Sequence, residues 1–162
     1  MRGRWPLDGT PAVVRRFSPP ATPYGRGHRG ADLGSQPGAI VRAAASGTVT
    51  FAGTVGDKGV VVVAHAGGLR TTYEPVTATA TVGAQVLAGA PIGILNPGHA
   101  GCLVPACLHW GLRRGDVYLD PLTLLGLGQV RLFPLSHNAE AVVPARAPLG
   151  DGPHRCRRCT RR

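Results

Sequence analysis

The sequence predicts a small all-β protein with a single antiparallel domain. Short runs rich in β-branched and aromatic residues follow one another along the chain, and glycines separate them. The 162 residues include 24 glycines and 15 prolines, yet 43% are hydrophobic. This composition is typical of short strands that are joined by many turns and still bury a core. The length is sufficient for one domain with tails and too small for two domains.

The first predicted elements follow the turn signals in the chain. Turn-forming residues are dense up to Asp32, so no helix is expected there. After Ile40 the chain predicts an antiparallel meander with strands at 48–51, 60–63 and 69–73. The segment 81–94 continues this pattern with small residues around one more short strand.

The last predicted elements carry side chains of chemical interest. Residues 107–112 form a strand in which Cys107 and His109 point to the same face, because side chains alternate along a strand. A short helical turn is expected after Pro121. From about Ser136 the composition changes to Ala, Pro, Gly and Arg, which predicts a disordered tail.

Basic residues are concentrated at the two ends of the chain. Residues 1–29 contain six arginines and Asp8, residues 151–162 contain five arginines and Asp151, and the part between them is nearly neutral. We expect both ends to be flexible and solvated, with at most a weak attraction to anionic polymers. No nucleic-acid motif occurs in the middle of the chain, so no specific nucleic-acid partner is expected.

No segment of the sequence predicts a passage through a membrane. The longest apolar run covers residues 60–64, far below the about 18 residues of a membrane span. Residues 1–4 have the charge of a signal-peptide start, but residues 5–9 supply no apolar h-region. We therefore expect no transmembrane segment, and no export signal in the chain as written.

Three residues form a candidate metal site. A catalytic zinc needs three protein ligands and an open position, because the metal must activate water and polarise the scissile carbonyl. His28 and Asp32 offer an imidazole and a carboxylate from a glycine-rich turn, and His109 offers a second imidazole from a strand. Spacing alone is a weak indication, since a lone strand histidine is more often a hydrogen-bonded structural residue.

A series of motifs around these residues extends over about residues 24–125. It consists of Gly27-His28-Arg29-Gly30-Ala31-Asp32-Leu33, then 37–43, 46–53, 59–63, 68–73 and 82–89, then Leu108-His109-Trp110-Gly111-Leu112-Arg113 and Asp120-Pro121. In order and spacing this series resembles the lysostaphin-type (LytM-like) zinc metalloendopeptidases of peptidoglycan. The series is too long for a chance match.

The resemblance implies a fold, an activity and a location. It implies a peptidase domain over residues 24–126, of the antiparallel sheet or sandwich kind with a duplicated hybrid motif, between an N-terminal extension (1–23) and a C-terminal tail (127–162). His28, Asp32 and His109 match the zinc ligands of that family. The implied partner is peptidoglycan, and the implied location is extracellular or in the cell envelope. We therefore expect the reading frame to extend upstream into a signal peptide.

Two positions depart from the family pattern. The family has a histidine where this chain has Cys107, and another where it has Pro75, so both catalytic histidines are missing. Such residues take the proton from the attacking water and stabilise the tetrahedral intermediate. The sequence thus leads to two hypotheses: an active zinc metalloendopeptidase of peptidoglycan, slowed by these losses and using another group as its base, and a catalytically degenerate module of the same fold that binds peptidoglycan or activates a cell-wall hydrolase.

Three residues are candidates for the missing catalytic role. Glu74 precedes Pro75, but strand alternation predicts that it faces away from the metal. His99 lies in a loop that leads to the strand of His109. Cys107 has three alternatives: a thiolate ligand, a disulfide with Cys102, or a small buried hydrophobe. The disulfide is favoured because Pro105 promotes a turn and the family is typically exported.

Two other groups of histidines and cysteines are not predicted to form a metal site. His65 ends a valine-rich strand and is not predicted to be a ligand. Cys156 and Cys159 have the spacing of half a zinc knuckle, but with His154 they do not complete a tetrahedral set. We expect them to be paired or reactive tail residues.

Overall fold

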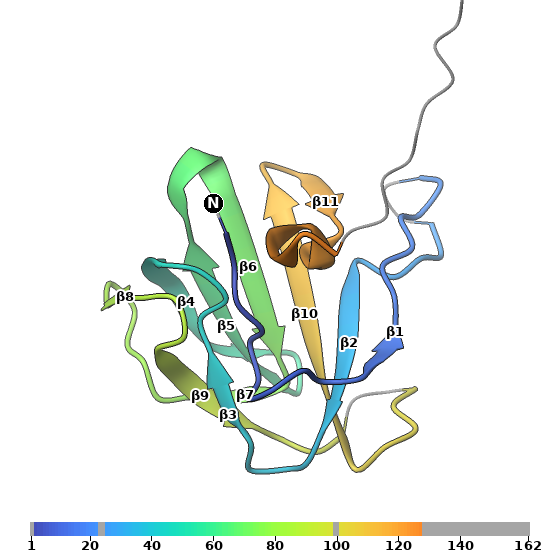
Figure 1. Ribbon diagram of the computed structural model, residues 1–162, viewed down its shortest axis with the longest axis horizontal. Helices are drawn as coiled ribbons and strands as arrows, with labels where there is room; N and C mark the ends of the chain where they lie inside the picture. Colours follow the sequence, from blue (N-terminus) through green and yellow to red (C-terminus); the bar gives the residue numbers. More distant parts are fainter. Residues whose placement is uncertain (1, 23–24, 99–100, 128–162) are drawn as a thin grey trace, which may run out of the picture. The chain divides into compact units, whose positions relative to one another are not determined.

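The computed structural model describes residues 2–22, 25–98 and 101–127 and contains strands joined by turns (Figure 1). The strands are β1 (Val13–Arg15), β2 (Gly30–Ser35), β3 (Ile40–Arg42), β4 (Gly47–Val55), β5 (Lys58–Ala64), β6 (Leu69–Glu74), β7 (Val76–Ala78), β8 (Gln85–Val86), β9 (Pro91–Leu95), β10 (Ala106–Arg114) and β11 (Val117–Leu119). Two short 3-10 helices, η1 (Ala66–Gly68) and η2 (Pro121–Leu125), complete the described elements. The predicted all-β class is confirmed. In these residues no helix has the length and apolar character of a bilayer span.

The described strands form two antiparallel sheets. The larger sheet has the order β1-β2-β10-β6-β5-β4-β8, and β11 pairs with the end of β10. The smaller sheet has the order β3-β9-β7. Figure 1 shows β6, β10, β2 and β1 side by side. Because β10 pairs with β6 on one edge and with β2 and then β11 on the other, its side chains lie in the middle of the sheet.

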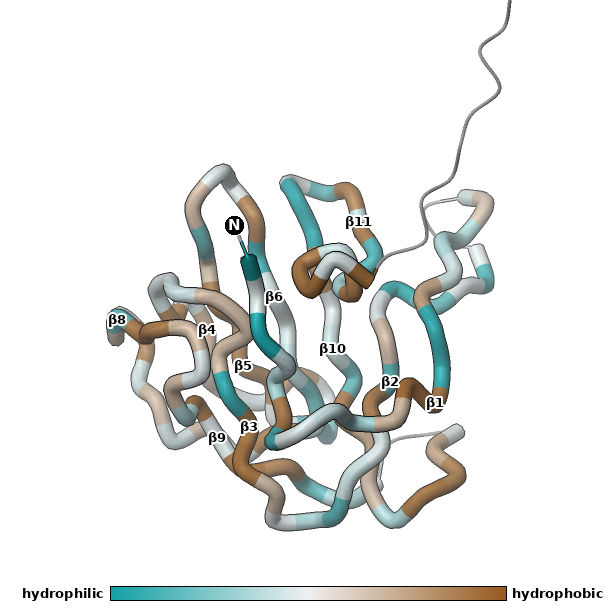
Figure 2. The backbone as a smooth tube through the Cα atoms, in the orientation of Figure 1, coloured by the Kyte–Doolittle hydropathy of each residue, from teal (hydrophilic) through white to brown (hydrophobic). Residues whose placement is uncertain are grey.

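The two faces of β10 have different environments. Leu108, Trp110 and Leu112 point to one face and are buried in the hydrophobic core. The helix η2 is apolar and packs beside β10 on this side (Figure 2). The Trp5 ring also packs there, 6.5 Å from the ring of Trp110 between centroids. His109 points to the opposite face, which the core elements leave open to a cavity.

The N-terminal segment packs against the domain, and the expectation that the basic end over residues 1–29 is flexible is wrong for residues 2–22. The backbone N–H groups of Gly3 and Arg4 donate to the carbonyls of Leu124 and Ala44 at 2.8 and 2.7 Å. Leu7 is buried, and β1 pairs with β2. Charge composition could not indicate this, because the segment is held by backbone hydrogen bonds and a few apolar side chains. The predicted tail, with His154, Cys156 and Cys159, lies outside the described residues beyond position 127.

The predicted helical turn at Pro121 is confirmed as η2. The Asp120 carboxylate accepts a hydrogen bond from the Leu122 N–H at 3.0 Å, which satisfies a donor at the start of the helix. Gly126 ends the helix with a φ of 75°, a conformation that glycine adopts without steric cost. This cap fixes η2 over the core face of β10.

Candidate metal centre

Asp32 and His109 face each other across two adjacent strands. They are direct partners in the antiparallel ladder between β2 and β10, so their side chains leave the same face of the sheet. The sequence predicted Asp32 in a turn, and this is wrong: Asp32 lies inside β2. The turn signals end at Gly30, where pairing with β10 on one side and β1 on the other holds the chain in strand conformation.

His28 approaches the same face from the segment before β2. Its backbone forms a bridge with Ser18, with N–H to carbonyl distances of 2.7 and 3.0 Å. The His28 Nδ1 lies 2.8 Å from the carbonyl oxygen of Arg16. A carbonyl can only accept, so Nδ1 carries the proton of this hydrogen bond. In the neutral ring, Nε2 therefore presents its lone pair.

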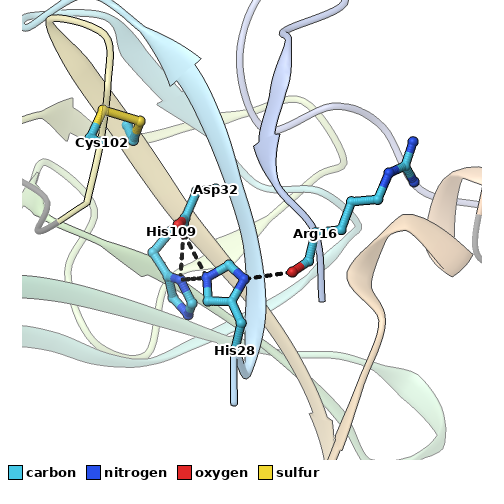
Figure 3. A network of polar contacts seen from close by, with 6 residues as sticks. Arg16, His28, Asp32, Cys102 and His109 are labelled. Atoms are coloured by element: carbon cyan, nitrogen blue, oxygen red, sulfur yellow. Dashed lines mark hydrogen bonds and ion pairs between the residues drawn. A yellow bond between two sulfur atoms is a disulfide. The ribbon is translucent and has the colours of Figure 1, made fainter. Parts of the chain in front are cut away.

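Three donor atoms converge in this site (Figure 3). The His28 Nε2 is 2.9 Å from the Asp32 Oδ1 and 3.1 Å from the His109 Nδ1. The third side of the triangle, from the His109 Nδ1 to the Asp32 Oδ1, is 2.8 Å. His28 and Asp32 are buried, while the His109 side chain keeps 15% of its surface exposed. The site is thus closed on the protein side and open beside His109.

The donor set fits a zinc ion. Two imidazoles and one carboxylate are ordinary zinc ligands, and ligands of a tetrahedral zinc lie about 3.3 Å from one another. The three observed distances are shorter by about half an ångström or less, which small side-chain rotations can supply. The lone pairs of His28 Nε2 and Asp32 Oδ1 also face each other at 2.9 Å. Two lone pairs repel at this distance unless a proton or a cation lies between them.

Gly30 makes room for the His109 ring. A Cβ atom at this position would lie 2.7 Å from the His109 Nε2 and 2.5 Å from the Trp110 carbonyl oxygen. Contacts this short do not occur without a shift of one partner, so any larger residue would displace the His109 ring, the backbone of β10, or both. The sequence motif around His28 contains this glycine, but its role is visible only when β2 lies beside β10.

The site opens into a cavity of about 420 Å³. Its lining includes His28 and His109, and also Glu74, Thr72 and Tyr118. The prediction that Glu74 faces away from the metal is wrong. Glu74 is the direct partner of His109 in the β6–β10 ladder, and Pro75 is the residue that turns inward and is buried. The prediction failed because it assumed that the chain stays in regular alternation at the position of the lost histidine.

Cys107 forms a disulfide with Cys102, as favoured from the sequence. The two Cα atoms are 5.8 Å apart, and Cys107 is fully buried. Cys107 is therefore neither a thiolate ligand nor a nucleophile in this structure. His99 lies outside the described residues, so its suggested role stays a prediction.

His65 is held in a buried hydrogen-bond network and is not one of the three candidate ligands. Its Nδ1 donates to the carbonyl of Ser46 at 2.9 Å, and its Nε2 lies 2.7 Å from the Thr71 hydroxyl. Thr71 is bonded in turn to the Tyr73 hydroxyl, which also accepts the N–H of Ala44. Burial lowers the pKa of His65 and raises the pKa of Tyr73 to about 12. The strand-end interpretation of His65 is confirmed, but the network was not predicted.

Sequence reasoning also missed three arginines of the cavity. Arg15, Arg29 and Arg113 all line it. The first two were assigned to a solvated basic end. Arg113 could have been found, because it follows His109 by four positions on one strand and so shares its face.

Comparison with known proteins gives a clear family match. The family model "Peptidase family M23" matches residues 26–121. The uncharacterized protein Rv2891 of Mycobacterium tuberculosis is 51% identical over 136 residues, which are 82% of this chain and 55% of that protein. The DD-carboxypeptidase/endopeptidase Mpg of Neisseria meningitidis is 32% identical over 98 residues, 60% of this chain and 22% of that protein. The chain thus spans about half of the length of the mycobacterial relatives it matches.

Solved structures with a similar fold differ in what they do. The catalytic domain of the antimicrobial peptidase lysostaphin from Staphylococcus simulans matches with a TM-score of 0.61 and 22% identity, over 72% of this chain and 92% of that one. The SpoIIQ-SpoIIIAH pore forming complex contains a chain that matches with a TM-score of 0.63 and 24% identity, over 76% of this chain and 90% of that one. At these identities the two structures show the shared fold alone.

Proposed function

Because the chain belongs to peptidase family M23, we propose that it is a zinc metalloendopeptidase that hydrolyses peptides of peptidoglycan in the cell envelope. The observation that carries the proposal is the convergence of His28 Nε2, Asp32 Oδ1 and His109 Nδ1 within 3.1 Å of one another. These are the three residues that match the zinc ligands of the lysostaphin type. A bound zinc ion would activate a water molecule and polarise the scissile carbonyl.

The surrounding residues fix the orientation of the three candidate ligands. The Arg16 carbonyl fixes the ring of His28 and keeps the proton on Nδ1. The ladder between β2 and β10 holds Asp32 and His109 side by side. Because His109 lines the cavity and is partly exposed, a peptide can approach from this side while the protein covers the other.

Glu74 is the residue that we propose for proton transfer. It lies beside His109 on the neighbouring strand, and it is the acidic side chain among those that line the cavity. Its carboxylate can accept the proton of the attacking water and return it to the leaving amine, the work that a histidine does at the family position of Pro75. A positioned general base raises the rate of hydrolysis by about 10²–10⁴-fold, so hydrolysis is efficient only if Glu74 takes the place of the missing histidine.

The second candidate function is a non-catalytic module that binds peptidoglycan or activates a cell-wall hydrolase. Two observations favour it. Cys107 is closed in a disulfide and buried, and Pro75 is buried and carries no group that titrates. If Glu74 does not act, the chain keeps the candidate ligands but has no group for proton transfer at either of the two positions where the family has a catalytic histidine.

Two measurements on the full chain test the proposal. The first is the zinc content of the purified wild type and of His109→Ala, with Asp8→Asn as a control because Asp8 lies at the surface and pairs with Arg42. We expect about one zinc per chain in the wild type and the control, and far less in His109→Ala. Equal content in all three proteins would refute the metal site.

The second measurement is the release of amine termini from purified peptidoglycan. We expect release that stops with a zinc chelator and returns with added zinc. A protein that contains zinc but releases no termini would refute the peptidase. In that case, sedimentation with peptidoglycan, or acceleration of a partner hydrolase, would support the second candidate.

A further inference from the structure

The cavity face of the sheet is built in three rows that run across the strands. The first row contains Glu74, His109, Asp32 and Arg15, which are direct partners on β6, β10, β2 and β1. Two residues further along β10, Gly111 lies between Thr72 and Gly30. The space over these glycines is taken by the Thr72 hydroxyl and by the edge of the His109 ring. This middle row therefore carries no long side chain.

The third row is basic. Arg113 lies opposite Arg70 on β6 and opposite Tyr118 on β11. The guanidinium of Arg29 lies 5.8 Å from the centroid of the Tyr118 ring. Like charges directly opposite each other destabilise a sheet, so the Arg70 and Arg113 pair has an electrostatic cost in the absence of an anion.

The charges of the cavity are unbalanced toward this end. Arg29 and Arg113 line the cavity near the third row, whereas Arg15 lies opposite Asp32 in the first row, where Glu74 is the acidic residue of the lining. Arg113 donates from Nε to the Gly115 carbonyl at 2.8 Å and from Nη2 to Asp116 at 3.3 Å. A guanidinium has five N–H donors, and Asp116 is fully exposed, so this ion pair is weak and leaves donors for a ligand.

The distance between the first and third rows sets a length. Residues on one face of a strand are about 6.7 Å apart, so two steps separate the rows by about 13 Å. An extended peptide advances about 3.3 Å per residue, so this distance corresponds to about four residues. Because an arginine side chain can bend back along the groove, a span of two to four residues is accessible.

We propose that the end of the cavity lined by Arg29 and Arg113 binds a carboxylate of the peptide substrate, two to four residues from the bond that is cleaved beside His109. This inference rests on the proposed function, since it takes the scissile bond to lie at the candidate metal centre. A guanidinium binds a carboxylate with two parallel charge-assisted hydrogen bonds, which gives both affinity and register. The substrates are therefore acidic peptides, and uncharged peptides of the same length bind poorly.

Four tetra-alanine peptides test the proposal. They share one backbone and carry either a succinyl or an acetyl group at the N-terminus and either an acid or an amide at the C-terminus. Binding to the zinc-loaded full chain is measured by calorimetry. We expect at least one singly charged peptide to bind about tenfold more tightly than the acetyl amide.

Two variants of adjacent residues provide the matched comparison. Arg113→Gln and Arg114→Gln each remove one positive charge from β10, but Arg114 is exposed and is not among the cavity residues. We expect the preference for the charged peptide to fall close to one in Arg113→Gln and to persist in Arg114→Gln. Direct binding of a carboxylate to zinc would persist in both variants, and this result would overturn the proposal. Equal losses in both variants would indicate only long-range attraction and would also overturn it.

The same peptides distinguish this proposal from the proposed function. Cleavage of all four peptides at equal rates would leave the peptidase intact and overturn the carboxylate site. Preferential binding without any cleavage, with the preference lost only in Arg113→Gln, would support the carboxylate site and count against the peptidase. Failure of every charged peptide to bind would overturn the carboxylate site.

Discussion

Glu74 and His109 are direct partners across the ladder between β6 and β10, and both side chains line the same cavity. If Glu74 transfers the proton, Glu74→Gln keeps the size of the side chain and removes its basicity. We expect the rate of peptidoglycan cleavage to fall by about 100-fold or more at unchanged zinc content. Asp57→Asn, which removes an exposed carboxylate in the turn between β4 and β5, serves as the control. A wild-type rate in Glu74→Gln would exclude Glu74 as the base.

Gly30 is predicted to control zinc affinity without being a ligand. In Gly30→Ala the new Cβ would lie 2.5 Å from the Trp110 carbonyl oxygen and 2.7 Å from the His109 Nε2, so the His109 ring and the adjoining backbone of β10 have to shift relative to Asp32 and His28. We expect zinc affinity to fall by about 10-fold or more, as it does when other residues that orient metal ligands are changed. Competition with a chromogenic chelator measures this affinity. Gly53→Ala is a suitable control, because its Cβ would meet only the tip of the Phe51 ring at 3.3 Å. Equal affinity in wild type and Gly30→Ala would contradict the steric argument.

The disulfide between Cys102 and Cys107 is predicted to stabilise the start of β10. It closes a loop with a sequence separation of five residues. A disulfide stabilises the folded state by lowering the conformational entropy of the unfolded chain, and a short loop lowers it only a little. We therefore expect a contribution of about 2 kcal/mol to the free energy of unfolding. Urea denaturation of the wild type and of Cys102→Ser measures it. Peptide mapping before and after reduction should find Cys102 linked to Cys107, and a free Cys102 thiol in the untreated protein would refute the pairing.

His65 is predicted to make stability depend on pH. Burial lowers its pKa in the folded state from the ordinary value of 6.5, so the unfolded chain binds the proton more readily. The stability from the neutral ring is complete above about pH 6.5 and is lost as the pH falls through the lower pKa of the folded state. We expect the Tm to fall between pH about 7.5 and about 5, by a few degrees more in the wild type than in His65→Gln.

This comparison has to be made with a chelator present. Metal binding then contributes to neither protein, and the difference between the two proteins reports His65. The same fall in Tm for both proteins would show that His65 does not contribute to the pH dependence.

The sequence by itself determined the class of the fold and the identity of the candidate ligands. Strand-forming runs between glycines are local signals, because period-two alternation and turn residues act over a few positions. His28, Asp32 and His109 were found by their place in a long ordered series of motifs. The Cys102 and Cys107 pair was also accessible, since the two residues are close in the chain.

The tertiary structure alone decided what surrounds these residues. Whether Glu74 faces the cavity depends on the register of β6 against β10, which no local pattern fixes, and the chain departs from regular alternation at Pro75. The packing of residues 2–22 depends on carbonyl groups of Ala44 and Leu124, far away in the sequence. Arg113 lines one cavity with Arg15 and Arg29, although the sequence assigns the last two to a solvated basic end, because β10 lies beside β2 and β2 lies beside β1.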